Sequence, residues 1–135
     1  MPISLTDALK AIAAAHAKAG ELGVLVSATV LDEGGLPVAM GRMDGAMALS
    51  AQISEGKAIG AALLARDGDA VMAIAEQRLV FFQQVAQMAR VPIVPGLGSL
   101  AIKRGGTCQG AIGISGAKPE EDLECARAAL AALNL

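Results

Sequence analysis

The sequence has 135 residues, which is long enough for one domain with its own hydrophobic core and too short for two. Its net charge of -2, with only two Phe and no Tyr or Trp, argues against nucleic-acid binding, which needs basic and stacking surfaces. No uncharged stretch reaches the roughly 18 residues that cross a bilayer, and the amino terminus lacks a basic region followed by an apolar core, so we expect a cytoplasmic protein without membrane contact.

Residues 4–22 predict an amphipathic helix. Ser4 and Asp7 have the spacing of a helix-capping pair, and Gly20 or Gly23 ends the helix. The side chains expected on its buried face recur at helical spacing: Leu5, Leu9, Ile12, His16 and Ala19. His16, the only histidine of the chain, is therefore expected on an apolar surface.

A β-hairpin follows this helix. Residues 24–31 and 36–43 predict two strands, and the acidic and glycine residues at 32–35 form the turn between them. Pro37 favours an edge position for the second strand, because proline has no backbone N–H to donate to a neighbour.

The alanine-rich residues 47–65 predict a second helix. Gly56 and Gly60 form a small patch on it, four residues apart, that would let another backbone approach closely. Only 18% of the residues are charged, so we expect some apolar surface to meet another copy of the chain. We therefore expect a homo-oligomer, a dimer or larger. The glycine patch is either its contact or packs only against the chain's own sheet.

The second half of the chain predicts two short helices, a loop, another hairpin and a last helix. Their ranges are 70–77 and 79–89 for the helices, 91–99 for the loop, 100–103 and 107–115 for the strands and 119–133 for the last helix. Hairpins rather than crossover units therefore stand at the centre of the chain. The order predicts an α+β fold in which helices flank an antiparallel sheet.

Gly110 and Gly113 lie on opposite faces of the last predicted strand. A glycine within a strand marks close approach, here of a packed helix, another subunit or a flat ligand. The two cysteines, Cys108 and Cys125, lack metal-ligand spacing, so we interpret them as small buried thiols and expect neither a disulfide nor zinc.

Several segments together carry a resemblance to a known family. They are VLDEGG at 30–35, GRMDGA at 41–46, Lys57-Ala58, GAIGISG at 110–116 and Glu121-Asp122. In this order they resemble the GlcG/HbpS family, which includes the carboxy-terminal domain of PduO-type cobalamin adenosyltransferases. The resemblance covers nearly the whole chain, residues 1–135, as a single domain.

The resemblance implies a profilin-like fold, with a five-stranded antiparallel sheet between helices in an α/β/α arrangement, and assembly into oligomers. It also implies a small ligand, with haem or a corrinoid such as cobalamin as the cofactor. Relatives often carry a Gly-Gly-Pro-Ile-like sequence before the last hairpin, whereas this chain has PGLGSL at residues 95–100. This loop is expected to line the pocket.

His16 is the candidate metal ligand. A neutral imidazole could bind haem iron or cobalt, or could act as a general acid or base near neutral pH. Some haem-binding relatives are thought to use a histidine in the first helix. The alternative is a half-buried histidine whose ring is hydrogen-bonded to the backbone. The aromatic content of 1% argues against a tight haem pocket.

Arg42, Asp44 and Lys57 are the other candidates. Arg42 and Asp44 stand at the end of a predicted strand and Lys57 lies along the next helix, so two cations near one cleft would suit a carboxylate, with Asp44 as a base. The alternatives are an ion pair between Arg42 and Asp44, or a helix cap at Asp44. Gly113 and Ser115 are further candidate ligand-binding positions, because the turn after Ser115 could offer backbone amides to an anion.

Two hypotheses follow for function. The first is a small-ligand-binding protein of the GlcG/HbpS type that binds haem or a corrinoid, with His16 as metal ligand. The second is an enzyme of small organic-acid or aromatic catabolism, such as a tautomerase, isomerase or hydrolase. In that enzyme Arg42 and Lys57 would hold a substrate carboxylate and Asp44 or His16 would move protons.

Overall fold

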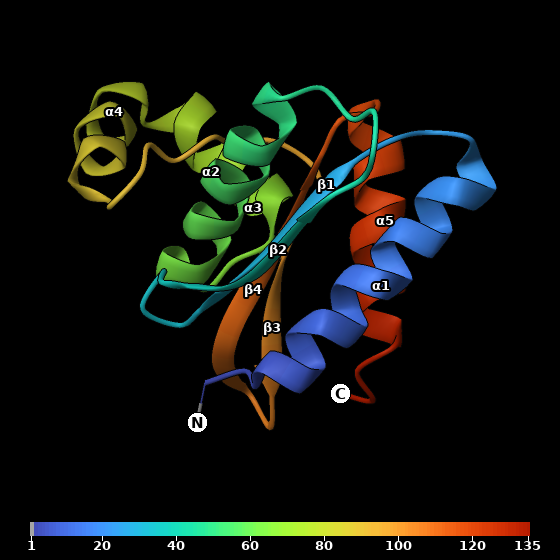
Figure 1. Cartoon of the computed structure of the whole chain (residues 1–135). Coiled ribbons are helices and arrows are strands. Elements are labelled where there is room, and N and C mark those ends of the chain that lie inside the picture. Colours follow the sequence, from blue (N-terminus) through green and yellow to red (C-terminus); the bar gives the residue numbers. More distant parts are fainter. Residues whose placement is uncertain (1) are drawn as a thin grey trace.

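The structure is a computed structural model that describes residues 2–135 (Figure 1). These residues form five helices and four strands. In chain order they are α1 (Leu5–Leu22), β1 (Ser27–Asp32), β2 (Pro37–Arg42), α2 (Leu49–Leu64), α3 (Gly68–Gln77), α4 (Leu79–Met88), β3 (Ser99–Arg104), β4 (Thr107–Ser115) and α5 (Pro119–Ala131). The predicted α+β class and the order of its elements are confirmed.

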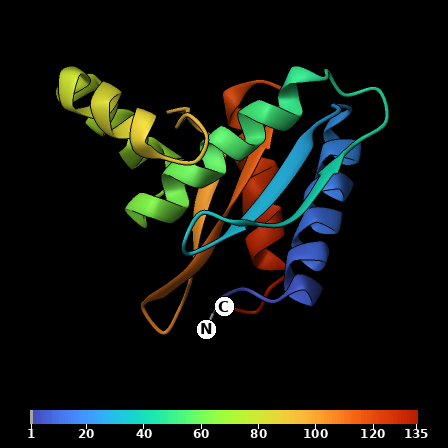
Figure 2. The same ribbon diagram turned by 60° about the vertical axis from the view of Figure 1, so that its left-hand side comes forward.

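The strands form one antiparallel sheet in the order β2-β1-β4-β3. Helices α1 and α5 pack side by side on one face, and α2 covers the other (Figures 1 and 2). Helices α3 and α4 form a small hairpin beyond α2, farthest from α1 (Figure 2). The strands β2 and β3 are the two edges of the sheet.

The fifth strand implied by the family resemblance is wrong for the residues described. Between β2 and β3 the chain forms α2, α3, α4 and a loop instead. This loop carries Pro92 and Pro95, which cannot donate to a sheet, and Gly96 and Gly98 have φ values of 146° and 110°, outside the range of a strand. The segment therefore contributes no strand.

Helix α1 begins and ends as expected, but part of its predicted buried face is wrong. The Ser4 hydroxyl accepts the N–H of Asp7 at 3.1 Å, and Gly23 ends the helix with φ of 72°. Leu5 and Leu9 are 56% and 53% exposed. The buried side consists mainly of small residues, Ala8, Ala11, Ile12, Ala15 and Ala19, because it packs on a similarly small surface of α5, formed by Cys125, Ala126 and Ala129.

The patch of Gly56 and Gly60 on α2 is covered by the chain itself. A methyl group on Gly56 would lie 2.6 Å from Val94 Cγ2, and one on Gly60 would lie 2.7 Å from Ile93 Cγ2. The bare helix surface thus accommodates the loop before β3 and is not available to another subunit. If the chain forms an oligomer, another surface must carry the contact.

The glycines of β4 have a structural explanation. A side chain on Gly113 would overlap the carbonyl oxygen of Ser54 and the amide of Ala58, because α2 lies directly against this part of β4. Gly110 approaches the Leu31 carbonyl in the same way. Of the three predicted explanations for a glycine in this strand, the packed helix is the one observed at Gly113.

Both cysteines are free, as expected, but only Cys125 is buried. Cys108 is half-buried because it lies near the β3–β4 turn, beyond the part of the sheet that helices cover. The described residues contain no helix that combines the length and the apolar character needed to cross a membrane.

Candidate functional site

A groove runs beside β2 on the α2 face of the sheet. Helix α2 covers β4 and β1 but little of β2. A hollow of about 220 Å³ remains there, lined by Thr29, Pro37, Met40, Ala51, Gln52 and Glu55. A second hollow of about 410 Å³ lies along α2, lined by Leu49, Gln52, Ile53, Glu55, Val91, Pro92 and Val94. The two share Gln52 and Glu55, and we call them together the α2 groove.

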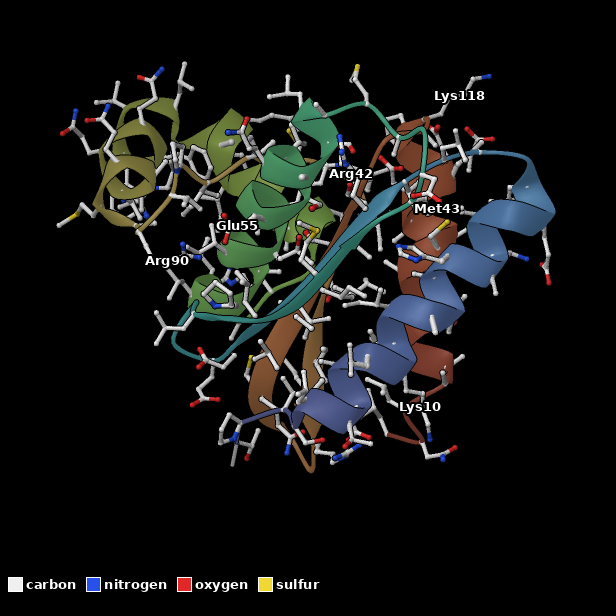
Figure 3. The ribbon with its side chains drawn as sticks, viewed as in Figure 1. Lys10, Arg42, Met43, Glu55, Arg90 and Lys118 are labelled. Carbon is white, nitrogen blue, oxygen red and sulfur yellow. The ribbon has the colours of Figure 1, made fainter. Side chains whose placement is uncertain are left out.

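An ion pair holds the loop that forms one wall of the α2 groove. Arg90 Nη2 lies 2.8 Å from Glu55 Oε2, and the same nitrogen donates to the Gly35 carbonyl at 3.2 Å. Figure 3 shows Glu55 on α2 and Arg90 in the loop after α4 pointing toward one another. Arg90 thereby connects the loop, α2 and the β1–β2 turn. No sequence signal links residues that lie 35 positions apart.

Two pairs of buried hydroxyl groups fix α2 on β1. Ser27 Oγ lies 2.8 Å from Ser50 Oγ, and Thr29 Oγ1 lies 2.7 Å from Ser54 Oγ. Ser50 also donates to the Met47 carbonyl just before α2, and Ser54 donates to the Ala51 carbonyl within α2. Each hydroxyl of α2 therefore has two partners, as buried polar groups require. Sequence analysis did not identify these pairs.

Arg42 lies two residues beyond Met40, which lines the smaller hollow, but does not itself line either hollow of the α2 groove. It stands opposite Ser27 at the end of β2, and strand alternation puts it on the same face as Met40, the side of α2. Figure 3 shows it beside the start of α2, with Met43 on the side of α1. Among the described residues Arg42 has no ion-pair partner, and the cap position of α2 is Ala48, so Asp44 neither pairs with Arg42 nor caps the helix.

His16 lies on the opposite face of the sheet. Its Nε2 is 3.0 Å from the carbonyl oxygen of Gly41, and the ring is half-buried between α1 and β2. Gly41 turns its hydrogen toward this ring, since a methyl there would lie 2.9 Å from His16 Cε1. The backbone-bonded histidine is thus the arrangement observed. Gly41 and Arg42 are neighbours in a strand, so His16 and the Arg42 side chain lie on different faces.

Lys57 lies beneath α2 and does not reach the α2 groove. It is 8% exposed, and its Nζ donates to the Ile114 carbonyl at 2.9 Å and to Asp122 Oδ2 at 3.1 Å. The other Asp122 oxygen accepts the amide of Ala117 at 3.1 Å. Burial raises the pKa of Asp122 above its ordinary value, and the neighbouring Lys57 acts in the opposite direction. The predicted cleft with Arg42 and Lys57 side by side is not formed.

Ser115 and Gly113 lie in the covered part of β4. Ser115 is buried opposite Ser27, and Gly113 is beneath α2. The amides after Ser115 are already bonded, because Ala117 donates to Asp122 and Lys118 donates to Glu121. The carboxylates of α5 therefore occupy the position that an anion would take.

The fold and the groove define a small α+β domain that carries a largely aliphatic surface groove, with the Arg42 cation on the same face of the sheet. This chain belongs to the family described as haem degrading protein HbpS-like, whose model matches residues 3–131. The resemblance seen in the sequence is thereby confirmed.

Similar proteins support this membership over the whole chain. An uncharacterised 15.0 kDa protein from the dhaT-dhaS intergenic region of Citrobacter freundii is 34% identical over 129 residues, covering 95% of this chain and 89% of that protein. The crystal structure of Klebsiella pneumoniae protein ORFY matches with 32% identity and a TM-score of 0.85, covering 97% of this chain and 90% of that one. A crystal structure of a PduOC:haem complex matches with 25% identity and a TM-score of 0.88, covering 99% and 96%.

Proposed function

We propose that this chain is a haem-binding protein and that the α2 groove holds the porphyrin. The observation that carries the proposal is the match over 99% of the chain to the PduOC structure, which was determined as a haem complex. The groove adds a surface of suitable chemistry in this chain. Because haem has a flat apolar ring and two carboxylates, its site needs aliphatic or aromatic walls and a cation near the edge.

The walls of the α2 groove suit the ring of a porphyrin. Leu49, Ile53, Val91, Pro92 and Val94 line the larger hollow with aliphatic surface. Its volume of about 410 Å³ lies within the roughly 300–1,000 Å³ of typical ligand pockets. Both hollows are open to solvent, so a bound ring would keep one edge exposed. The absence of Tyr and Trp makes the contact aliphatic, and we expect binding weaker than in an enclosed haem pocket.

Polar groups at the groove suit the other parts of haem. Arg42 follows Met40 on the same face of β2, and from there its guanidinium would pair with a propionate. Met40 lines that hollow, and its thioether is of a type that would bind haem iron. His16 would have to release the Gly41 carbonyl, or use Nδ1, and would bind on the other face of the sheet. The groove therefore favours Met40 over His16 as the residue beside the metal.

Titration of the purified protein with haemin tests the proposal. The wild type should give a shifted Soret band with a stoichiometric endpoint. Met40→Ala should change the position of that band, and Arg42→Ala should weaken binding by about tenfold, the loss of one charge-assisted hydrogen bond. His16→Ala and Met88→Ala, a change on the distant helix α4, should leave the spectrum and affinity unchanged.

Two results would count against this assignment. A featureless titration of the wild type would exclude haem as the ligand. A parallel titration with aquocobalamin would then test whether the protein binds a corrinoid. Loss of the Soret shift in His16→Ala, with Met40→Ala unaffected, would place the ligand on the α1 face. The enzyme hypothesis gains no support from the geometry, because Arg42, Lys57 and His16 lie at three separate places.

A further inference from the structure

A further pocket lies at the β3 edge of the sheet, opposite the edge where β2 borders the α2 groove. It has a volume of about 150 Å³ and lies between the start of α3, the start of β3 and α5. It shares no lining residue with either hollow of the α2 groove. We call it the α3–α5 pocket. Because a water molecule occupies about 30 Å³ in the liquid, the pocket suits a ligand of about five or six non-hydrogen atoms.

A buried hydroxyl group in the α3–α5 pocket has no partner. Ser99, the first residue of β3, lines the pocket and is 2% exposed. No described residue bonds to its hydroxyl, whereas all four hydroxyls between α2 and β1 have partners. Gly68 faces it without a side chain, since a methyl there would lie 2.7 Å from Ser99 Oγ. Buried polar groups are nearly always hydrogen-bonded, so this hydroxyl indicates a partner that enters the pocket.

Charges of opposite sign line the pocket on different sides. Asp67 and Asp69 come from the start of α3, and Arg127 comes from α5. Arg127 forms no ion pair among the described residues, and so it pairs with neither carboxylate across the pocket. Each carboxylate uses only its Oδ1 atom within the part of the chain described, where it accepts one backbone N–H. Both kinds of charge are therefore available to a ligand.

We propose that the α3–α5 pocket binds a small zwitterion, an α-amino acid with a short side chain. Arg127 would hold the carboxylate of the ligand through two parallel hydrogen bonds. Asp67 and Asp69 would accept hydrogens of its ammonium group. Ser99 would donate its hydroxyl hydrogen to the ligand and would so gain the partner that it lacks.

The mixed charge of the pocket selects this class of ligand. A simple anion would face the carboxylates of Asp67 and Asp69, and a simple amine would face the guanidinium of Arg127. Like charges brought together in a binding site cost free energy. A neutral polyol of the same size would bond to the same groups but would leave their charges without a counter-charge. A ligand that carries both charges on neighbouring groups meets each side of the pocket with the opposite sign.

Isothermal titration calorimetry of the haem-free protein with L-alanine tests the proposal. L-Alanine should bind saturably at one site per chain. Propionate, which lacks the ammonium group, and ethylamine, which lacks the carboxylate, should each bind at least about tenfold more weakly. The same holds for glycerol, which has as many non-hydrogen atoms as L-alanine. Equal affinity for any of these three compounds, or no saturable binding of glycine, L-alanine or L-serine at about 10 mM, would overturn the proposal.

Three substitutions test the residues assigned to the pocket. Ser99→Ala, Arg127→Gln and Asp69→Asn should each weaken the binding of L-alanine by about tenfold, the loss of one hydrogen bond to a charged group. Lys10→Gln, at an exposed position of α1, removes the same charge as Arg127→Gln and should leave the affinity unchanged. Unchanged affinity in Arg127→Gln would contradict the proposal.

The stability of the Ser99→Ala protein distinguishes a ligand-binding hydroxyl from a structural one. Without ligand, this change should not lower the melting temperature, because no hydrogen bond within the protein is lost. Ser54→Ala is the matched control, since it removes a buried hydroxyl that has two partners. It should lower the melting temperature and leave the binding of L-alanine unchanged. A lower melting temperature of Ser99→Ala with unchanged affinity would give its hydroxyl a structural role and overturn the proposal.

Discussion

Lys57 Nζ and Asp122 Oδ2 lie 3.1 Å apart beneath α2; Lys57 also donates to the Ile114 carbonyl near the end of β4, and Asp122 accepts the Ala117 amide between β4 and α5. This pair connects three elements that are distant in the sequence: α2, the end of β4 and the first turn of α5. The identity of both residues follows from this position, because a buried charge needs a partner and additional hydrogen bonds. The pair thus has a structural role that accounts for both residues.

Removing one member of this pair should destabilise the protein strongly. Lys57→Met should lower the free energy of unfolding by about 3 kcal/mol, because it leaves the buried Asp122 carboxylate without its cation. Urea unfolding followed by circular dichroism measures the change. Lys18→Met is the control, since Lys18 pairs with Glu21 on the surface, and it should cost less than about 1 kcal/mol. Equal effects of the two changes would contradict this account.

The pKa of Asp122 predicts a pH dependence of stability. Burial raises that pKa in the folded protein above the ordinary value of 3.8, so over the range just above 3.8 the folded state holds a proton that the unfolded chain has released. The contribution of Asp122 to the free energy of unfolding must therefore decrease as the pH rises through this range. Asp122→Asn should remove this slope, and unfolding measured from pH 3.5 to pH 7 compares the two proteins. An identical slope in both would count against it.

The two cysteines should differ in reactivity. Burial raises the pKa of the Cys125 thiol to about 11, so at pH 8 only about one molecule in a thousand carries the reactive thiolate. Ellman's reagent should therefore label only the half-buried Cys108 in the native protein and both cysteines in denaturant. The Cys108→Ser protein should stay unlabelled until it unfolds. Rapid native labelling of that variant would show that Cys125 is accessible.

Two glycine substitutions should have opposite effects. Gly113→Ala should destabilise the protein by about 2 kcal/mol or more, because the new methyl overlaps the backbone of α2. Gly20→Ala should stabilise it by about 0.5–1 kcal/mol, since a methyl there has no neighbour within 4 Å and alanine favours a helix. Thermal unfolding of both variants measures the difference. A neutral Gly113→Ala would mean that α2 approaches β4 less closely.

The fold was more accessible to sequence reasoning than the site. Helix α1 could be placed from the Ser4 cap and the terminal Gly23, and the hairpins from their glycine turns, because these signals are local. The prediction that Leu5 and Leu9 lie on the buried face of α1 is wrong. Alanines form that face because their small side chains let α5 approach, but in a sequence a periodic pattern of alanines is a weaker hydrophobic signal than one of leucines. The α2 groove depends on Arg90 reaching Glu55 across 35 residues, which no local pattern encodes.

The candidate residues divide along the same line. Arg42 was a candidate because a cation at a strand end is visible in the sequence; the structure puts it at the end of β2 without an ion-pair partner among the described residues, and its role as a ligand-binding residue stays a prediction. Lys57 looked equivalent, but its partner Asp122 is 65 residues away, so its burial could not be foreseen. His16 was correctly placed toward the sheet, yet only the structure shows that the Gly41 carbonyl accepts its Nε2.

The hydroxyl pairs between α2 and β1 fix the position of the helix along the strand. Ser50 and Ser54 are one helical turn apart, about 6 Å along α2, and Ser27 and Thr29 are two residues apart, about 6.6 Å along β1. The two spacings nearly coincide, so both pairs can close together only at one longitudinal position of the helix. If α2 slid by one turn, one buried hydroxyl of β1 would face an aliphatic side chain and would lose its hydrogen-bond partner. The alignment of α2 with β1 is thereby fixed, and with it the position of the α2 residues that line the groove.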